Sequence, residues 1–221
     1  MPIVHSVLIA SIVFAAVLAI RAYYLDADRR WQTYVFKPLA TLLVLALALA
    51  QSASAPAYRW ALVAGLVFST AGDVFLMLPR DRFIAGLVSF LIAHLFYIFA
   101  FSIGVPFGTA PLLWLPFFAA GGVVVAVIWR GLAPALRGAV IAYVVVIAVM
   151  AGQAAGRWHA LGGDAALAAA VGAALFVVSD SVLAINRFRV RFHAERAVTL
   201  GTYWTAQMLI VLSISASPFP A

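Results

Sequence analysis

The amino-acid sequence predicts an all-α integral membrane protein, built as a bundle of eight transmembrane helices. Of its 221 residues, 67% are hydrophobic and only 10% are charged, and the mean hydropathy is +1.12. Soluble domains are closer to half apolar and a quarter charged. An apolar run of about 20 residues spans a bilayer as a helix. Eight such runs occur, at residues 3–22, 35–51, 59–79, 83–103, 111–129, 135–152, 164–185 and 197–217.

Local sequence features mark how these segments begin, end and pack. The second segment is short and starts at Lys37-Pro38, where proline suits the first turn of a helix. Short basic turns follow the third and seventh segments, and the fifth to seventh are rich in the small residues that allow close helix packing. No linker or low-complexity stretch separates a second domain. Residues 1–221 are therefore expected to form a single transmembrane domain.

Basic residues are distributed unevenly between alternate loops. Twelve of the 14 lysines and arginines fall on one side of the predicted bundle, and only Arg59 and Arg157 fall on the other. Because cytoplasmic loops carry the excess of Lys and Arg, both chain termini are expected outside the cytoplasm. The net charge of +7 follows this pattern and does not indicate nucleic-acid binding. We expect a multi-pass protein of the bacterial inner membrane, surrounded by membrane lipids.

Two aspartates, Asp73 and Asp180, lie inside the third and seventh apolar segments in similar local sequences. Each follows a glycine by eight positions, follows a small residue directly and precedes a leucine by three. A charged side chain at mid-helix costs roughly +2.5 to +3.5 kcal/mol on insertion scales, so such residues mark functional sites. The two segments run in the same direction, and both carboxyl groups are expected roughly 9 Å below the cytoplasmic interface, at 1.5 Å rise per residue. The likeness is compatible with a weak parallel 4+4 repeat.

Polar residues on the two following segments share helix faces and are expected to line a cleft with the aspartates. His94 and Tyr97 are three positions apart, and Tyr203 and Gln207 are four apart. These four side chains could instead be interhelical hydrogen-bonding or packing residues. Two further candidates have similar alternatives: Asn186 as a helix C-cap, and Lys37 as a lysine that snorkels to the interface. An ion pair of the aspartates with Arg82 or Arg187 is the structural alternative to catalysis.

The residue types restrict the possible chemistry. Cysteine is absent, which excludes disulfides and thiolate chemistry. Two aspartates and one histidine make an incomplete metal-ligand set, and no nucleophile elbow surrounds Ser69 or Ser179. Two carboxylates at one depth suit acid catalysis better. In a low-dielectric cleft both cannot ionise cheaply, so one supplies a proton while the other carries negative charge.

At these residues the sequence resembles the YhhN-like lysoplasmalogenase family. The resemblance implies eight transmembrane helices and an ether hydrolase that cleaves the vinyl ether bond of lysoplasmalogens. Its products are a fatty aldehyde and a glycerophospho-ethanolamine or -choline, and it needs no cofactor. The family's proposed acidic pair corresponds to Asp73 and Asp180. The matching segments are residues 34–39, 69–77, 86–97, 176–184 and 203–207.

A lysophospholipid substrate gives the remaining polar residues a role in binding. Lys37, His94, Tyr97, Asn186, Tyr203 and Gln207 are the predicted substrate-binding residues, with Lys37 placed to meet the headgroup phosphate as a point charge. Two other classes of function stay open at this stage. One is a proton-coupled transporter of small molecules or lipids, with the aspartates as its protonation sites. The other is a non-catalytic membrane scaffold.

Overall fold

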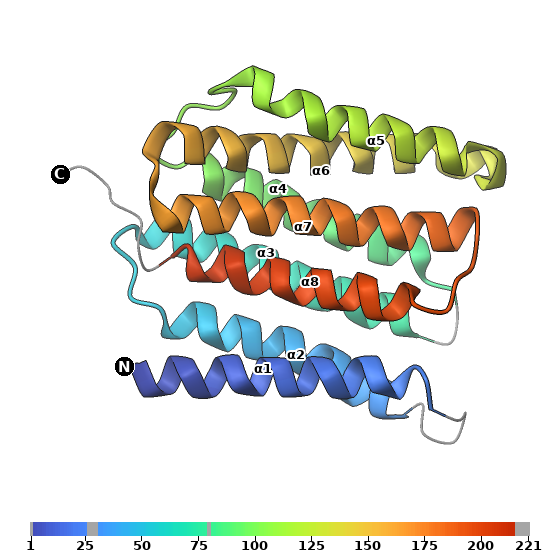
Figure 1. Ribbon diagram of the computed structural model, residues 1–221, viewed down its shortest axis with the longest axis horizontal. Helices are drawn as coiled ribbons and strands as arrows, with labels where there is room; N and C mark the ends of the chain where they lie inside the picture. Colours follow the sequence, from blue (N-terminus) through green and yellow to red (C-terminus); the bar gives the residue numbers. More distant parts are fainter. Residues whose placement is uncertain (1, 26–30, 79–80, 215–221) are drawn as a thin grey trace.

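The computed structural model describes residues 2–25, 31–78 and 81–214, and within these residues every regular element is a helix (Figure 1). The prediction of an all-helical bundle is therefore confirmed. The elements are α1 (Pro2–Ala22), α2 (Trp31–Ala50), α3 (Pro56–Met77), α4 (Phe83–Ser102), the short 3₁₀ turn η2 (Pro111–Trp114), α5 (Leu115–Ile128), the 3₁₀ turn η3 (Trp129–Gly131), α6 (Pro134–Leu161), α7 (Gly163–Phe188) and α8 (Glu195–Leu212).

Seven of the described segments are long and apolar enough to cross a membrane. The fifth of them joins η2, α5 and η3 into one segment, Pro111–Gly131. The chain is thus a multi-pass membrane protein. The helix α8 lies outside this set because its sequence mixes charged and hydroxyl side chains with apolar ones. Its role as an eighth span, and the placement of both termini outside the cytoplasm, stay predictions.

The helices lie side by side along the long axis of the molecule, and the start of α1 and the end of α8 are at the same end (Figure 1). Two hairpins make the most extensive helix–helix contacts, α3 with α4 and α7 with α8. Helix α2 contacts both α3 and α8, and α6 contacts both α4 and α7. The ends of α3 and α7 therefore meet the starts of α4 and α8 at the opposite end of the bundle from the start of α1.

Each of these two hairpins has a glycine at its tightest contact. A side chain at Gly65 in α3 would collide with the ring of Tyr97 in α4. A Cβ at Gly172 in α7 would lie 2.8 Å from the carbonyl oxygen of Ala206 in α8, too close for any real contact. The glycine eight positions before each aspartate is therefore there to let the next helix approach. The 4+4 repeat itself stays a prediction.

Several helix ends differ from the expected ones, and α8, for example, ends at Leu212 and not at residue 217. Helix α2 begins at Trp31, so Pro38 lies inside it and does not mark its first turn. Helix α6 continues to Leu161, past the expected end at residue 152, and Gly152 and Gly156 leave room there for Trp114 and for the Thr109 backbone. Helix α7 continues to Phe188, past the expected end at residue 185.

Candidate active site

A cleft of about 610 Å³ opens at the end of the bundle where α3 and α7 end and α4 and α8 begin. Its walls come from α2, α3, α4, α7 and α8, together with the turns after α3 and α7. Both aspartates singled out in the sequence, Asp73 and Asp180, line this one cleft. Segments more than 100 residues apart in sequence therefore bring two carboxyl groups to a shared space.

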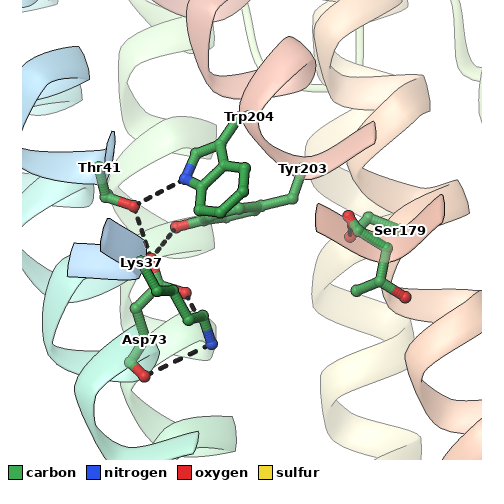
Figure 2. A network of polar contacts seen from close by, with 7 residues as sticks. Lys37, Thr41, Asp73, Ser179, Tyr203 and Trp204 are labelled. Atoms are coloured by element: carbon green, nitrogen blue, oxygen red, sulfur yellow. Dashed lines mark hydrogen bonds and ion pairs between the residues drawn. The ribbon is translucent and has the colours of Figure 1, made fainter. Parts of the chain in front are cut away.

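Asp73 is almost fully buried, with 2% of its surface exposed, and it is surrounded by hydrogen-bond donors (Figure 2). The ammonium group of Lys37 lies 3.3 Å from its Oδ1 atom. Its Oδ2 atom accepts hydrogen bonds from the Thr41 hydroxyl at 2.7 Å and the Tyr203 hydroxyl at 2.9 Å. The indole N–H of Trp204 donates to Thr41 Oγ1 at 3.1 Å, which orients the threonine hydroxyl toward Asp73. One cation and two hydroxyl donors favour the ionised carboxylate.

Asp180 has a different environment. Its Oδ2 atom accepts a hydrogen bond from the Tyr143 hydroxyl of α6, and the side chain is only partly buried. It also lines a second, apolar pocket among α3, α4, α5, α6 and α7, and four other residues line both spaces, namely Leu76, Phe83, Phe90 and Leu183. Among the described residues no basic side chain forms an ion pair with it. Asp180 therefore stands where the polar cleft meets the apolar pocket.

The structure divides the other predicted site residues into two groups. Lys37, Asn186 and Tyr203 line the cleft, whereas His94, Tyr97 and Gln207 lie behind it, fully buried. Lys37 is 4% exposed, so its ammonium contacts Asp73 and does not snorkel to the interface as in the alternative interpretation.

The deeper group forms a polar layer below the cleft. The Tyr97 hydroxyl donates to Gln207 Oε1 at 2.8 Å, which joins α4 to α8. The ring of His94 packs between aromatic side chains, with its centroid 4.7 Å from that of Phe176 and 5.3 Å from that of Tyr143. Neither ring nitrogen of His94 has a hydrogen-bond partner in the described part of the chain. A role of His94, Tyr97 and Gln207 in substrate binding stays a prediction.

Asn186 lies inside α7 and is not the C-cap considered as its alternative role. Its Oδ1 atom accepts a hydrogen bond from the backbone N–H of Phe192 at 3.3 Å. This contact ties the turn after α7 back onto the helix, beside the cleft. The helix continues past Asn186 to Phe188, whose backbone packs closely against Gly131 of η3.

An exposed ion pair crosses the mouth of the cleft. Arg187 at the end of α7 donates to Asp81 in the turn before α4, at 2.5 Å. The Arg187 guanidinium and the backbone N–H of Phe83 both donate to Asp81 and so hold the pKa of its carboxyl below the ordinary value. An ion pair of Asp73 or Asp180 with Arg82 or Arg187 was the structural alternative to catalysis, and none is found among the described residues. Arg187 pairs with Asp81, and Asp73 pairs with Lys37.

The sequence did not predict two hydrogen-bond partners of the aspartates, Thr41 of Asp73 and Tyr143 of Asp180. Thr41 follows Lys37 by four positions, so the shared helix face was a usable signal. Tyr143 stands in a run of valines and isoleucines and carries no local signal. Within residues 2–25, 31–78 and 81–214, no cluster of three or more His, Asp or Glu side chains could hold a metal ion.

The sequence matches a known protein family. The model of the YhhN family matches residues 32–214, which include both aspartates and every predicted site residue. The chain belongs to the YhhN family. It is 33% identical over 192 residues to the membrane protein YhhN of Escherichia coli O6:H1, covering 86% of this chain and 91% of that relative.

Other relatives of this family member are named lysoplasmalogenases. Human lysoplasmalogenase TMEM86A is 36% identical over 163 residues, which cover 71% of this chain and 65% of the human protein. Human lysoplasmalogenase TMEM86B is 34% identical over 168 residues, covering 74% and 67% of the two chains. No solved structure matches.

The buried pair between Lys37 and Asp73 gives a prediction about the stability of this family member. Lys37→Met leaves a carboxylate buried without its ammonium, and losing one partner of such a pair costs about 3–5 kcal/mol. The double variant Lys37→Met/Asp73→Leu removes both charges, and we expect it to melt at a higher temperature than Lys37→Met alone. Thermal unfolding in detergent measures both variants.

A matched control is available at the mouth of the cleft. Arg187→Gln breaks an exposed pair, and because exposed ion pairs contribute little, its melting temperature should stay near that of the unmodified protein. A double variant less stable than Lys37→Met would show that the pair is not the reason for the loss.

Proposed function

We propose that this protein is a membrane hydrolase that cleaves the vinyl ether bond of lysoplasmalogens. It releases a fatty aldehyde and a glycerophospho-ethanolamine or -choline. Membership of the YhhN family and the names of the two human relatives support this substrate class. The observation that carries the proposal is the pair of carboxyl groups, Asp73 and Asp180, in one cleft that adjoins an apolar pocket. We further propose that the protein acts in the bacterial inner membrane.

Vinyl ether hydrolysis begins with transfer of a proton to the alkene carbon farther from the oxygen. The alkene electrons form the new C–H bond, and the carbon bonded to oxygen becomes an oxocarbenium ion. Water adds to that carbon and loses a proton, giving a hemiacetal. The hemiacetal then collapses: its hydroxyl proton passes to the glycerol oxygen, the C–O bond breaks, and the aldehyde is released. The slow step needs an acid and, close by, a negative charge that stabilises the cation.

Asp73 is suited to be the negative charge. Its carboxylate is paired with the Lys37 ammonium and accepts two hydroxyl hydrogen bonds, from Thr41 and Tyr203. These donors hold the carboxylate in one orientation before the substrate arrives. A fixed anion stabilises a developing positive charge without reorganising during the reaction. Lys37 acts in this scheme through Asp73.

Asp180 is suited to be the proton donor. It is accessible from the cleft, its hydrogen bond comes from the neutral Tyr143 hydroxyl, and it borders the apolar pocket. A carboxyl group next to apolar side chains and near a second carboxylate keeps its proton more readily. After donating the proton, the Asp180 carboxylate can accept one from the attacking water. The acid is thereby restored, as in the carboxylate pairs of glycosidases.

The two adjoining spaces fit the two ends of a lysolipid. The cleft is lined by charged and polar groups, which suit a glycerophosphate headgroup, and the apolar pocket suits the first carbons of an alkenyl chain. The vinyl ether joins those two parts of the molecule, so it would lie near Asp180, where the two spaces meet. Asn186 and Tyr203 then line the headgroup side, while His94, Tyr97 and Gln207 support the site from below.

The proposed activity is tested by aldehyde release from purified protein in detergent. We expect a lysolipid with a vinyl ether bond to be cleaved, and lysolipids of equal chain length with an alkyl ether or ester bond to be left intact. An alkyl ether has no alkene to protonate, and an ester needs a nucleophile or activated water. Activity without a membrane gradient also distinguishes a hydrolase from a proton-coupled transporter. No aldehyde from any vinyl ether would contradict the proposal.

Replacing either carboxyl group tests the mechanism. Asp73→Asn and Asp180→Asn keep shape and hydrogen bonding but remove the charge and the proton. We expect each to lower kcat by about 10²- to 10⁴-fold, the usual contribution of a positioned acid or base. Thermal unfolding of the same samples checks that the fold is intact. A folded variant with a near-normal rate would show that its aspartate is structural.

The apolar pocket gives a prediction about chain length. Val124 of α5 lines the pocket, so Val124→Phe fills part of it. We expect kcat/KM for long alkenyl chains to fall roughly tenfold relative to short ones, the scale of discrimination in apolar pockets. Val123→Phe is the matched control, because Val123 is 63% exposed on the outside of the same helix. Equal chain-length profiles for the two variants would place the chain elsewhere.

A further inference from the structure

The mouth of the cleft carries more positive than negative charge. Four arginines line it, Arg82 in the turn before α4, Arg187 at the end of α7, Arg191 in the turn after α7 and Arg196 at the start of α8. Besides Asp73 and Asp180, the acidic residues that line the cleft are Asp81 and Glu195. This excess remains after every ion pair at the mouth is formed.

Among the residues that the structure describes, the ion pairs leave two of these four arginines without a carboxylate partner. Arg187 pairs with Asp81 at 2.5 Å, and Arg196 pairs with Glu195 at 3.1 Å. Arg82 and Arg191 have no ion pair or side-chain hydrogen bond to any residue in the described ranges 2–25, 31–78 and 81–214. Both are exposed, and they reach the cleft from opposite hairpins, one from the α3–α4 turn and the other from the α7–α8 turn.

The lysine predicted to meet the substrate phosphate is already engaged. Lys37 is buried, and its ammonium lies 3.3 Å from Asp73 Oδ1 and 3.5 Å from the Asp73 carbonyl oxygen. A phosphate that binds Lys37 would have to compete with the Asp73 carboxylate for the ammonium group. It would also have to reach the depth in the bundle at which this carboxylate is buried. The exposed arginines at the mouth pose no such conflict.

We propose that Arg82 and Arg191 form the binding site for the phosphodiester of the substrate headgroup. This inference rests on the proposed function and adds to it the group that is recognised. A guanidinium presents paired N–H donors that match phosphate oxygens, and such charge-assisted hydrogen bonds are stronger than neutral ones. Only the glycerol carbons separate the phosphate of a lysoplasmalogen from its vinyl ether oxygen. A headgroup held at the mouth therefore directs the vinyl ether inward, toward Asp73 and Asp180.

Kinetics with and without the phosphate test the site. The variants are Arg82→Gln, Arg191→Gln and their combination, assayed on a lysoplasmalogen and on a 1-alkenylglycerol of the same chain, which lacks phosphate. We expect each single variant to raise KM for the lysoplasmalogen about tenfold with kcat nearly unchanged, since each loses one charge-assisted hydrogen bond that is made equally in the ground and transition states. KM for the alkenylglycerol should not change. Arg130→Gln, an exposed arginine outside the cleft, is the control.

The opposite change is expected at Asp81. Asp81→Asn removes the carboxylate that engages Arg187 and frees a third guanidinium at the mouth. KM for the lysoplasmalogen should fall in this variant, whereas KM for the alkenylglycerol should not. An equal rise in KM for both substrates in the arginine variants, or an unchanged KM in Asp81→Asn, would overturn the phosphate site.

A binding arm keeps the test independent of catalysis. Affinity is measured in neutral detergent for an acyl lysophosphatidylethanolamine and for the monoacylglycerol of the same chain, neither of which has a vinyl ether. The double arginine variant should lose affinity for the first ligand only. If that holds while no vinyl ether is cleaved, the proposed function fails and the phosphate site stands. If the variants matter only in vesicles with anionic phospholipids, the arginines bind bilayer headgroups, and the substrate site is overturned.

Discussion

The buried ion pair between Lys37 and Asp73 is the interaction on which the rest of the site depends. An isolated charge inside a membrane helix is costly, so each of these two side chains requires the other. Lys37 comes from α2 and Asp73 from α3, while the hydroxyl of Tyr203 brings in α8. The carboxylate thereby fixes how three helices meet at one end of the bundle. Both side chains of this ion pair line the cleft at that end.

The two carboxyl groups differ because the bundle surrounds them differently. Asp73 faces α2 and α8, which supply a cation and two hydroxyls. Asp180 faces α6 and the apolar pocket and receives the hydroxyl of Tyr143. One residue type in two environments can therefore take two roles, an anion and a proton donor. In the proposed mechanism, the different roles of the two aspartates follow from the different packing around them.

Much of the fold and part of the site could be read from the sequence. Membrane-length apolar runs predicted the helices, and the rarity of carboxylates in such runs singled out Asp73 and Asp180. Helix ends were less predictable, because local rules place Pro38 in a first turn, whereas α2 begins at Trp31 and Pro38 lies inside it. The partner of Asp180 could not be found at all: Tyr143 meets it only because α6 packs on α7, and no local pattern encodes that contact.

The α3–α4 and α7–α8 hairpins contribute to the cleft in corresponding ways. Each has a glycine eight positions before its aspartate, and each glycine admits the following helix, at Tyr97 in one hairpin and at Ala206 in the other. Each also has, in the turn that follows, an arginine that forms no ion pair with a carboxylate among the described residues, Arg82 after Asp73 and Arg191 after Asp180. Close packing joins the two helices of each hairpin, and the turn between them lines the cleft with its arginine. Together the two turns place positive charge at the mouth, with the buried Asp73 and the partly buried Asp180 below it in the same cleft. A lysophospholipid, with a phosphate above its vinyl ether, has the complementary order of groups.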